Sequence, residues 1–148
     1  MKNIKTDICI IGAGSGGLSI ASGAVQMGAK VVLLEGHKMG GDCLNYGCIP
    51  SKALLAAAKT KMAFGPAKDH VAIAIETIAP HDSVERFEGL GVKVISQFGT
   101  FISPTQVQAG DTIITARRFV IATGSAPFVP PITGLENLPY DTNETIFQ

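Results

Sequence analysis

A glycine-rich turn between an apolar run and a helix-forming segment limits the possible folds of this chain more than any other feature. Residues 12–17 (GAGSGG) have the spacing GxGxxG. They follow the apolar run 6–11, whose β-branched residues favour a strand buried on both faces of a parallel sheet. Residues 14–27 carry apolar and small side chains at helical spacing, and 30–35 indicate a second buried strand. Together these segments predict a βαβ unit.

The glycines of this unit have the spacing of a dinucleotide-binding turn. We expect Gly12 to make the tight turn, Gly14 to let a pyrophosphate approach the backbone, and Gly17 to let helix and strand pack closely. The phosphates would bind the free N–H groups at the helix N-terminus. Glu35, at the end of the second strand, would accept hydrogen bonds from an adenosine ribose. A glycine-rich turn without a ligand is the alternative, and the motif alone does not separate FAD from NAD.

The rest of the sequence predicts helices followed by short strands. Residues 36–47 read as a loop, and 49–62 as a helix that ends before Gly65-Pro66. Further helices are expected over 70–79 and up to Leu90, the latter capped by Asp82 or Ser83. Five short β runs then follow, with Ala116 separating the last two: 93–96, 99–102, 106–109, 112–116 and 117–122. The pattern predicts an α/β fold with a parallel sheet and a small antiparallel β-meander.

The composition restricts the classes of function. Twelve basic and twelve acidic residues give a formal net charge of zero, which argues against binding to nucleic acid or an anionic membrane surface. The longest apolar runs are far short of the ~20 residues that a membrane helix requires. Three cysteines without a signal sequence indicate a reducing compartment, where paired cysteines are more often catalytic or metal-binding than structural. We therefore expect a cytoplasmic protein.

Cys43 and Cys48 are candidates for a redox-active pair. Gly47, between them, permits the bend that a disulfide needs. The helix beginning near Pro50 points its positive end at Cys48 and favours a thiolate there. Lys52, four residues further on, would add positive charge on the same helical face.

Two other interpretations of these cysteines remain: an inert pair of buried thiols, or half of a zinc site with CxxxxC spacing. No pair of Cys or His partners lies nearby in the sequence, so no metal site is expected. Cys9, inside the first strand, is interpreted as a small core residue.

The segment 40–55 (GGDCLNYGCIPSKALL) resembles the redox-active segment of the class I pyridine nucleotide-disulfide oxidoreductases, which include dihydrolipoamide dehydrogenase, glutathione reductase and mercuric reductase. The resemblance extends from Thr6 to the end of the chain and includes 97–101 (QFGTF) and 119–127 (FVIATGSAP). It implies a Rossmann-like FAD-binding domain, of which residues 1–148 would be the N-terminal segment. On this basis the chain is truncated relative to the family, without the NAD(P)-binding and dimerisation domains.

The resemblance also implies roles for individual residues. Cys48 would be the charge-transfer thiol next to the flavin, Cys43 the interchange thiol that attacks substrate, and Lys52 the lysine near flavin N5. Gly99 would serve the turn on the adenine side. The full set of implied FAD contacts is Gly12, Gly14, Ser15, Gly17, Glu35, Gly41, Asp42, Lys52, Gly99, Thr100, Ala122, Thr123 and Gly124.

The implied function is electron transfer from NAD(P)H through FAD to the Cys43–Cys48 disulfide, and on to a small-molecule, disulfide or metal-ion substrate. Such enzymes are homodimers, and we expect little turnover from the 148 residues alone. Asp42 stands where the family usually has Thr, which is similar to a mercuric-reductase-like branch, and the segment 62–70 is shorter than usual. The alternative function is a dinucleotide-binding module whose cysteines are structural or bind metal.

Overall fold

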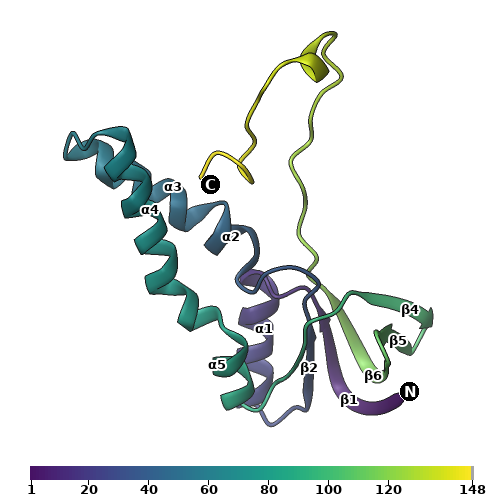
Figure 1. Cartoon of the computed structure of the whole chain (residues 1–148). Helices are drawn as coiled ribbons and strands as arrows, with labels where there is room; N and C mark the ends of the chain where they lie inside the picture. The colour runs from purple at the N-terminus through teal and green to yellow at the C-terminus, as the bar shows by residue number, and fades with distance from the viewer. Residues whose placement is uncertain (148) are drawn as a thin grey trace.

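The protein is built around one mixed six-stranded sheet (Figure 1). The structure, a computed structural model, describes residues 1–147. The strands follow the order β3-β2-β1-β6-β5-β4. Strands β3, β2, β1 and β6 run parallel to one another, and β5 pairs antiparallel with both β6 and β4. The bounds are β1 Lys2–Ile11, β2 Val31–Leu34, β3 Lys93–Ile95, β4 Gly99–Ser103, β5 Gln106–Ala109 and β6 Thr112–Ile121. This is the predicted α/β fold with a parallel sheet and an antiparallel meander.

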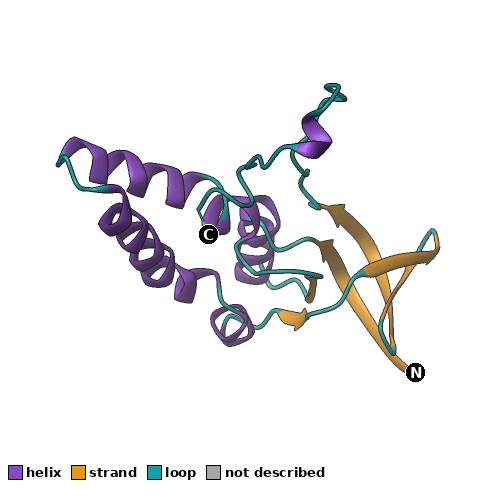
Figure 2. Cartoon of the chain, turned by 45° about the horizontal axis from the view of Figure 1, so that its top comes forward, coloured by secondary structure: helices purple, strands orange, loops and turns teal. Residues whose placement is uncertain are grey.

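The helices lie to one side of the strands (Figure 2). Helices α1 and α5 lie beside the parallel strands, and α3 and α4 form a hairpin that projects away from the sheet (Figure 1). The bounds are α1 Ser15–Gln26, α2 Gly41–Asn45, α3 Cys48–Lys59, α4 Phe64–Ile78 and α5 Val84–Gly89, with short 3₁₀ turns η1 Ala79–Asp82 and η2 Leu135–Asn137. In the described residues, 1–147, no helix combines the length and apolar character needed to cross a membrane.

Two apolar clusters hold the layers together, because successive residues of a strand point to opposite faces of the sheet. On one face, Ile10 and Leu33 pack with Leu18 of α1 and Phe87 of α5. The other cluster joins Cys9, Val32 and Leu34 of the parallel strands to Val107, Ala109, Ile114 and Ala116 of the meander. Cys9 is fully buried, as expected of a core residue, and burial raises its pKa to about 11.

The structure corrects three predictions of secondary structure. Residues 36–47 are not all loop, because they contain α2. Gly65-Pro66 do not end a helix: they lie in the first turn of α4, where the missing N–H of proline costs no hydrogen bond. Ala116 does not divide two strands, because β6 pairs with β1 along nearly its whole length and Ala116 is buried in that ladder.

The boundaries that depend on local capping agree better with prediction. Ser83 caps α5, since its hydroxyl accepts a hydrogen bond from the N–H of Arg86 at 3.2 Å. Gly28 follows the end of α1 with φ of +83°, the left-handed conformation expected of a C-terminal glycine.

Candidate functional site

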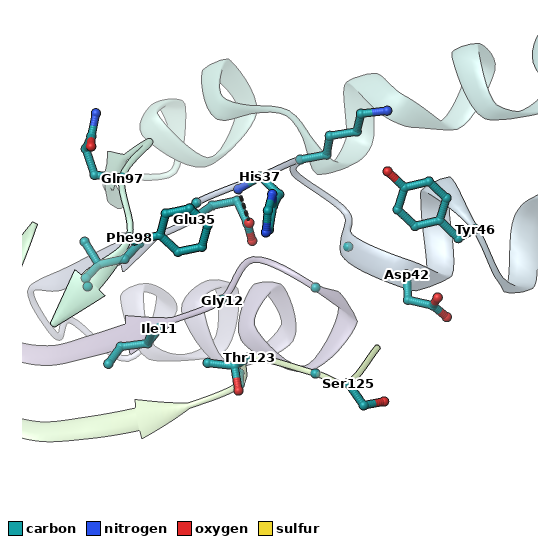
Figure 3. Close-up of a pocket in the computed structure, with 18 of the residues that line it drawn as sticks. Ile11, Gly12, Glu35, His37, Asp42, Tyr46, Gln97, Phe98, Thr123 and Ser125 are labelled. Carbon is teal, nitrogen blue, oxygen red and sulfur yellow. Dashed lines mark hydrogen bonds between the residues drawn. The ribbon is translucent and has the colours of Figure 1, made fainter. Parts of the chain in front are cut away.

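The carboxyl ends of the central strands meet at one edge of the sheet. The N–H of Gly12 donates to the carbonyl of Leu34 at 2.8 Å, and the N–H of Ala122 donates to the carbonyl of Ile11 at 2.8 Å. A groove of about 590 Å³ opens at this edge (Figure 3). In open α/β sheets, ligands bind in the crevice outside the carboxyl ends of the strands.

Two glycines of the GxGxxG motif are required by the fold itself. Gly12 has φ of +107°, and a Cβ there would overlap the carbonyl oxygen of Ala122. At Gly17 a Cβ would overlap the carbonyl oxygen of Gly12. These positions make the tight turn and the close approach of helix to strand that the spacing predicted.

Gly14 has no such requirement within the protein. Its φ is −78°, which any residue adopts, and the nearest atom to a Cβ there is the Cα of Gly41 at 3.9 Å. Gly14 lines the groove. The space beside it therefore lies open to a ligand that approaches the backbone.

The N-terminus of α1 is free of side-chain caps. Gly14 is the N-cap and offers no side chain, and the first turn contains no acidic residue. The first-turn N–H groups and the helix dipole therefore suit a phosphate at the groove. Together with the open space at Gly14, this arrangement fits the diphosphate of a dinucleotide.

Glu35 is already engaged by the backbone around it. Its carboxylate accepts hydrogen bonds from the N–H of Ala13 at 2.7 Å and from the N–H of His37 at 2.8 Å, the latter drawn dashed in Figure 3. The residue is half-buried and lines the groove. Because a carboxylate has about four acceptor sites, two such bonds leave room for a ribose hydroxyl.

An aromatic wall stands at the Glu35 end of the groove. The rings of His37 and Phe98 meet edge to face, with centroids 4.9 Å apart. Phe98 is 64% exposed, and its ring lies where a Cβ of Gly36 would be. Gly99 is required by packing, since a Cβ there would lie 2.7 Å from Cδ1 of Leu34. A partly exposed aromatic surface of this kind suits the flat face of a base.

The opposite end of the groove is formed by α2, which contacts the glycine motif directly. The N–H of Gly40 donates to the carbonyl of Ala13 at 2.9 Å, and Gly40 forms a parallel bridge with Gly14. Gly41 has φ of +55°, and a Cβ there would lie 2.7 Å from the Cα of Gly14. Backbone therefore touches backbone at this point, which explains two consecutive glycines before Cys43.

Cys43 and Cys48 lie on either side of the bend between α2 and α3. Cys43 is half-buried on α2, and Cys48 is exposed as the first residue of α3, after the N-cap Gly47. Both are free thiols. The pKa of Cys43 is raised, first by its hydrogen bond with the thiol of Cys48 and then by burial, while the charge of Lys52 acts in the opposite direction. The thiol of Cys48 therefore influences the protonation of Cys43 across the bend.

The groove collects most of the predicted cofactor contacts but not all of them. Thr100 is exposed on β4, and Ser15 and Lys52 are exposed at helix surfaces. The predicted site residues that do not line the groove are Ser15, Gly17, Thr100, Cys43, Cys48 and Lys52. The predicted residues that line it are Gly12, Gly14, Glu35, Gly41, Asp42, Gly99, Ala122, Thr123 and Gly124.

Several lining residues were not predicted. Half of them are immediate sequence neighbours of predicted residues, and four more lie two or three positions away, which is the signal that would have found them. Glu144, far along the chain, gave no such signal. The additional residues are Ile11, Leu34, Gly36, His37, Lys38, Tyr46, Gln97, Phe98, Ser125 and Glu144. Across residues 1–147 there is no cluster of three His, Cys, Asp or Glu side chains suited to a metal ion.

Comparison with known proteins places these features in context. The family model for pyridine nucleotide-disulphide oxidoreductases matches residues 6–147. Dihydrolipoyl dehydrogenase 2, chloroplastic, of Arabidopsis thaliana is 38% identical over 87% of this chain and 26% of the relative. A mercuric reductase of Lysinibacillus sphaericus is 31% identical over 96% of this chain and 29% of the relative.

A solved structure shows the same arrangement of elements. It is a Cu(II) complex of RclA, an HOCl-induced flavoprotein disulfide reductase of Escherichia coli, with a TM-score of 0.83 and 27% identity. The match covers 92% of this chain and 32% of RclA. The chain therefore spans about a quarter to a third of the length of these relatives.

Proposed function

Because the chain belongs to the pyridine nucleotide-disulphide oxidoreductase family, we propose that residues 1–148 form the N-terminal segment of an FAD-binding domain whose groove holds FAD and whose Cys43 and Cys48 are its redox dithiol. Enzymes of this family are flavoproteins that use FAD and NAD(P)H. The observation that carries the proposal is the backbone contact between Gly41 and Gly14. This contact sets the thiol-bearing helix directly against the dinucleotide-binding turn.

Different groups of residues along the groove would contact different parts of the cofactor. Gly14 and the N-terminus of α1 would hold the diphosphate, and Glu35 would accept a ribose hydroxyl. The His37–Phe98 wall lies at the same end as Glu35, and Asp42 and Tyr46 lie at the other (Figure 3). Residues 122–124 follow β6 at the same sheet edge and would contact the flavin side. Bound FAD would supply two-electron redox chemistry.

The two cysteines would take different roles in the reduced pair. The raised pKa of Cys43 keeps its proton in place at neutral pH, whereas Cys48 is the exposed first residue of α3. After losing its proton, Cys43 would attack a substrate disulfide, releasing one substrate thiolate and forming a mixed disulfide. Cys48, once deprotonated, would then attack the sulfur of Cys43, releasing the second substrate thiolate, which takes a proton from solvent, and leaving the Cys43–Cys48 disulfide.

The substrate class is a disulfide or a soft metal ion, since thiolates serve both. The relatives include a mercuric reductase and a flavoprotein disulfide reductase solved with Cu(II). We expect the enzyme to be a homodimer that NAD(P)H reduces, in a reducing compartment such as the cytoplasm. Such a compartment keeps an exposed thiol reduced between turnovers.

Replacing Gly14 tests the cofactor assignment without disturbing the fold. Gly14→Ala introduces no clash within the protein, so the apo chain should unfold within about 1 kcal/mol of wild type. FAD affinity should fall about tenfold or more, because the added methyl group occupies the space of the diphosphate. Gly23→Ala, where a Cβ has no neighbours within 4 Å, is the control and should leave FAD affinity unchanged. Equal FAD affinity in the two variants, or no FAD binding by wild type, would contradict the assignment.

Absorbance tests the roles of the thiols. Two-electron reduction of the FAD-loaded protein should give a long-wavelength band from a thiolate beside the flavin. Cys48→Ser should abolish this band, and Cys43→Ser should keep it. A band that survives in the Cys48 variant would reverse the two roles, and no band in wild type would favour a dinucleotide module without redox chemistry.

A further inference from the structure

The last described segment returns from far along the chain to α2. After β6 the chain runs out in extended form through η2 and then comes back beside the helices (Figures 1 and 2). Its end forms a turn held by its own side-chain and backbone hydrogen bonds. The hydroxyl of Thr145 donates to Asp141 at 2.9 Å, and the N–H of Ile146 donates to the carbonyl of Thr142 at 3.0 Å. We call residues 141–146 the return turn.

A hydrogen bond joins the return turn to the thiol-bearing helix. Nδ2 of Asn143 donates to Oδ1 of Asp42 at 2.8 Å, across 101 positions of sequence. Glu144, the next residue, lines the groove together with Asp42. The return turn therefore meets both α2 and the groove at one place.

The other carboxylate oxygen of Asp42 faces the bend between the two cysteines. A Cβ at Gly47 would lie 2.6 Å from Oδ2 of Asp42. Asp42 thus lies between the return turn and the residue preceding Cys48, and it is itself the residue before Cys43. A change in the position of its carboxylate would therefore affect the backbone next to both cysteines.

We propose that Asn143 is a positioning residue, which holds the Asp42 carboxylate and through it fixes α2 so that the Cys43 thiol faces Cys48. This inference rests on the proposed redox role of the two cysteines. It gives a function to the return turn, which the GxGxxG and cysteine motifs do not include.

Helix α2 needs such support because of its length. A five-residue helix makes too few hydrogen bonds to be stable alone. Its N-terminal end is fixed by the Gly41–Gly14 contact, and the side chain of Asn45 donates to the carbonyls of Gly41 and Met39. These contacts and the buried side chain of Leu44 hold α2 on the groove, and Asp42 adds a bond from α2 to the return turn. A hydrogen bond to a charged acceptor is stronger than one between neutral groups, so Asn143 is suited to hold the exposed side of α2 at Asp42.

The equilibrium between the dithiol and glutathione measures this positioning and needs no flavin. Oxidation converts the two thiols to one disulfide while one glutathione disulfide is reduced to two glutathione thiols. The apo chain is equilibrated at fixed glutathione ratios, quenched with acid, and analysed by mass spectrometry of the tryptic peptide 39–52, which contains both cysteines. The equilibrium constant reports how readily the sulfurs reach bonding distance.

Loss of the hydrogen bond should weaken disulfide formation. Asn143→Ala should lower the equilibrium constant about fivefold, equivalent to ~1 kcal/mol. Asn143→Asp should lower it further, because a second carboxylate would then face Asp42. The double variant Asp42→Asn/Asn143→Asp restores a donor and an acceptor with their places exchanged, and should return the constant to within about twofold of wild type, well under 1 kcal/mol. Asn137→Ala, on the same segment, removes a side-chain amide that donates to the neighbouring Glu136; it is the matched control and should have no effect.

The outcomes separate this inference from the function on which it rests. An equilibrium constant for Asn143→Ala equal to that of wild type overturns the positioning role, as does a double variant no better than Asn143→Asp. If wild type itself forms no Cys43–Cys48 disulfide, the redox function fails instead. Urea unfolding of each variant shows whether a change in the constant comes from a general loss of stability, which would also overturn the role.

Discussion

The carboxylate of Glu35 stabilises the empty protein, apart from any contact with a ligand. It accepts the N–H groups of Ala13, which is fully buried, and of His37. Hydrogen bonds to charged groups contribute about 1.5–3 kcal/mol each. In Glu35→Gln one oxygen remains to accept, and the new amide group faces an N–H that it cannot accept from. We therefore expect the apo chain to lose about 2 kcal/mol of unfolding free energy.

Urea unfolding of the apo chain measures this loss directly. With a slope of about 2 kcal/mol per molar urea, the midpoint should fall by about 1 M while the slope stays unchanged. Glu76→Gln makes the same chemical change at an exposed position of α4 and should shift the free energy by less than about 0.5 kcal/mol. A Glu35→Gln midpoint equal to that of the Glu76 variant would refute the structural role. Any effect on FAD affinity would then belong to ribose contact alone.

Three further predictions follow from the geometry. Gly17→Ala should unfold the chain or destabilise it by several kcal/mol, because the added Cβ overlaps the carbonyl of Gly12. Gly16→Ala, whose Cβ has no neighbours within 4 Å, should instead stabilise the chain by about 1 kcal/mol in thermal unfolding. The N–H of Lys30 donates to Asp7 and lowers the pKa of its carboxyl below 3.8. Wild type should therefore be more stable than Asp7→Asn above pH 3.8, and the difference should vanish as pH falls through the lowered pKa. A stability difference that persists in acid would contradict this. Lys52→Gln should move the pH profile of Cys43 alkylation to higher pH, since the lysine charge lowers the pKa of that thiol; a profile moved to lower pH would exclude this contact.

The βαβ unit could be predicted from sequence because its signals are local. The apolar runs, the glycine spacing and Glu35 all lie within about 30 residues, the usual size of such a unit. Capping at Ser83 was equally local. These features need no knowledge of distant residues.

The features that sequence did not predict depend on contacts between distant segments. Helix α2 begins with Gly41, directly after its N-cap Gly40, and lacks local helix propensity, but the contact of Gly41 with Gly14 fixes it in place. The strand β6 continues past Ala116 because β1 lies alongside it. The bond from Asn143 to Asp42 joins residues that no motif links. In each case a long-range partner overrides or adds to the local pattern.

The glycines of the dinucleotide turn show why a shared motif does not imply a shared role. Gly12 and Gly17 are held by overlap with the protein's own backbone, so replacing either would damage the fold and any cofactor site together. Loss of FAD binding in those variants would therefore say little about contact with FAD. Gly14 alone of the three combines an ordinary φ, open space and a place in the groove. A methyl group at Gly14 would clash with a bound ligand and not with the protein itself. Gly14 is therefore the position at which mutation distinguishes cofactor binding from folding.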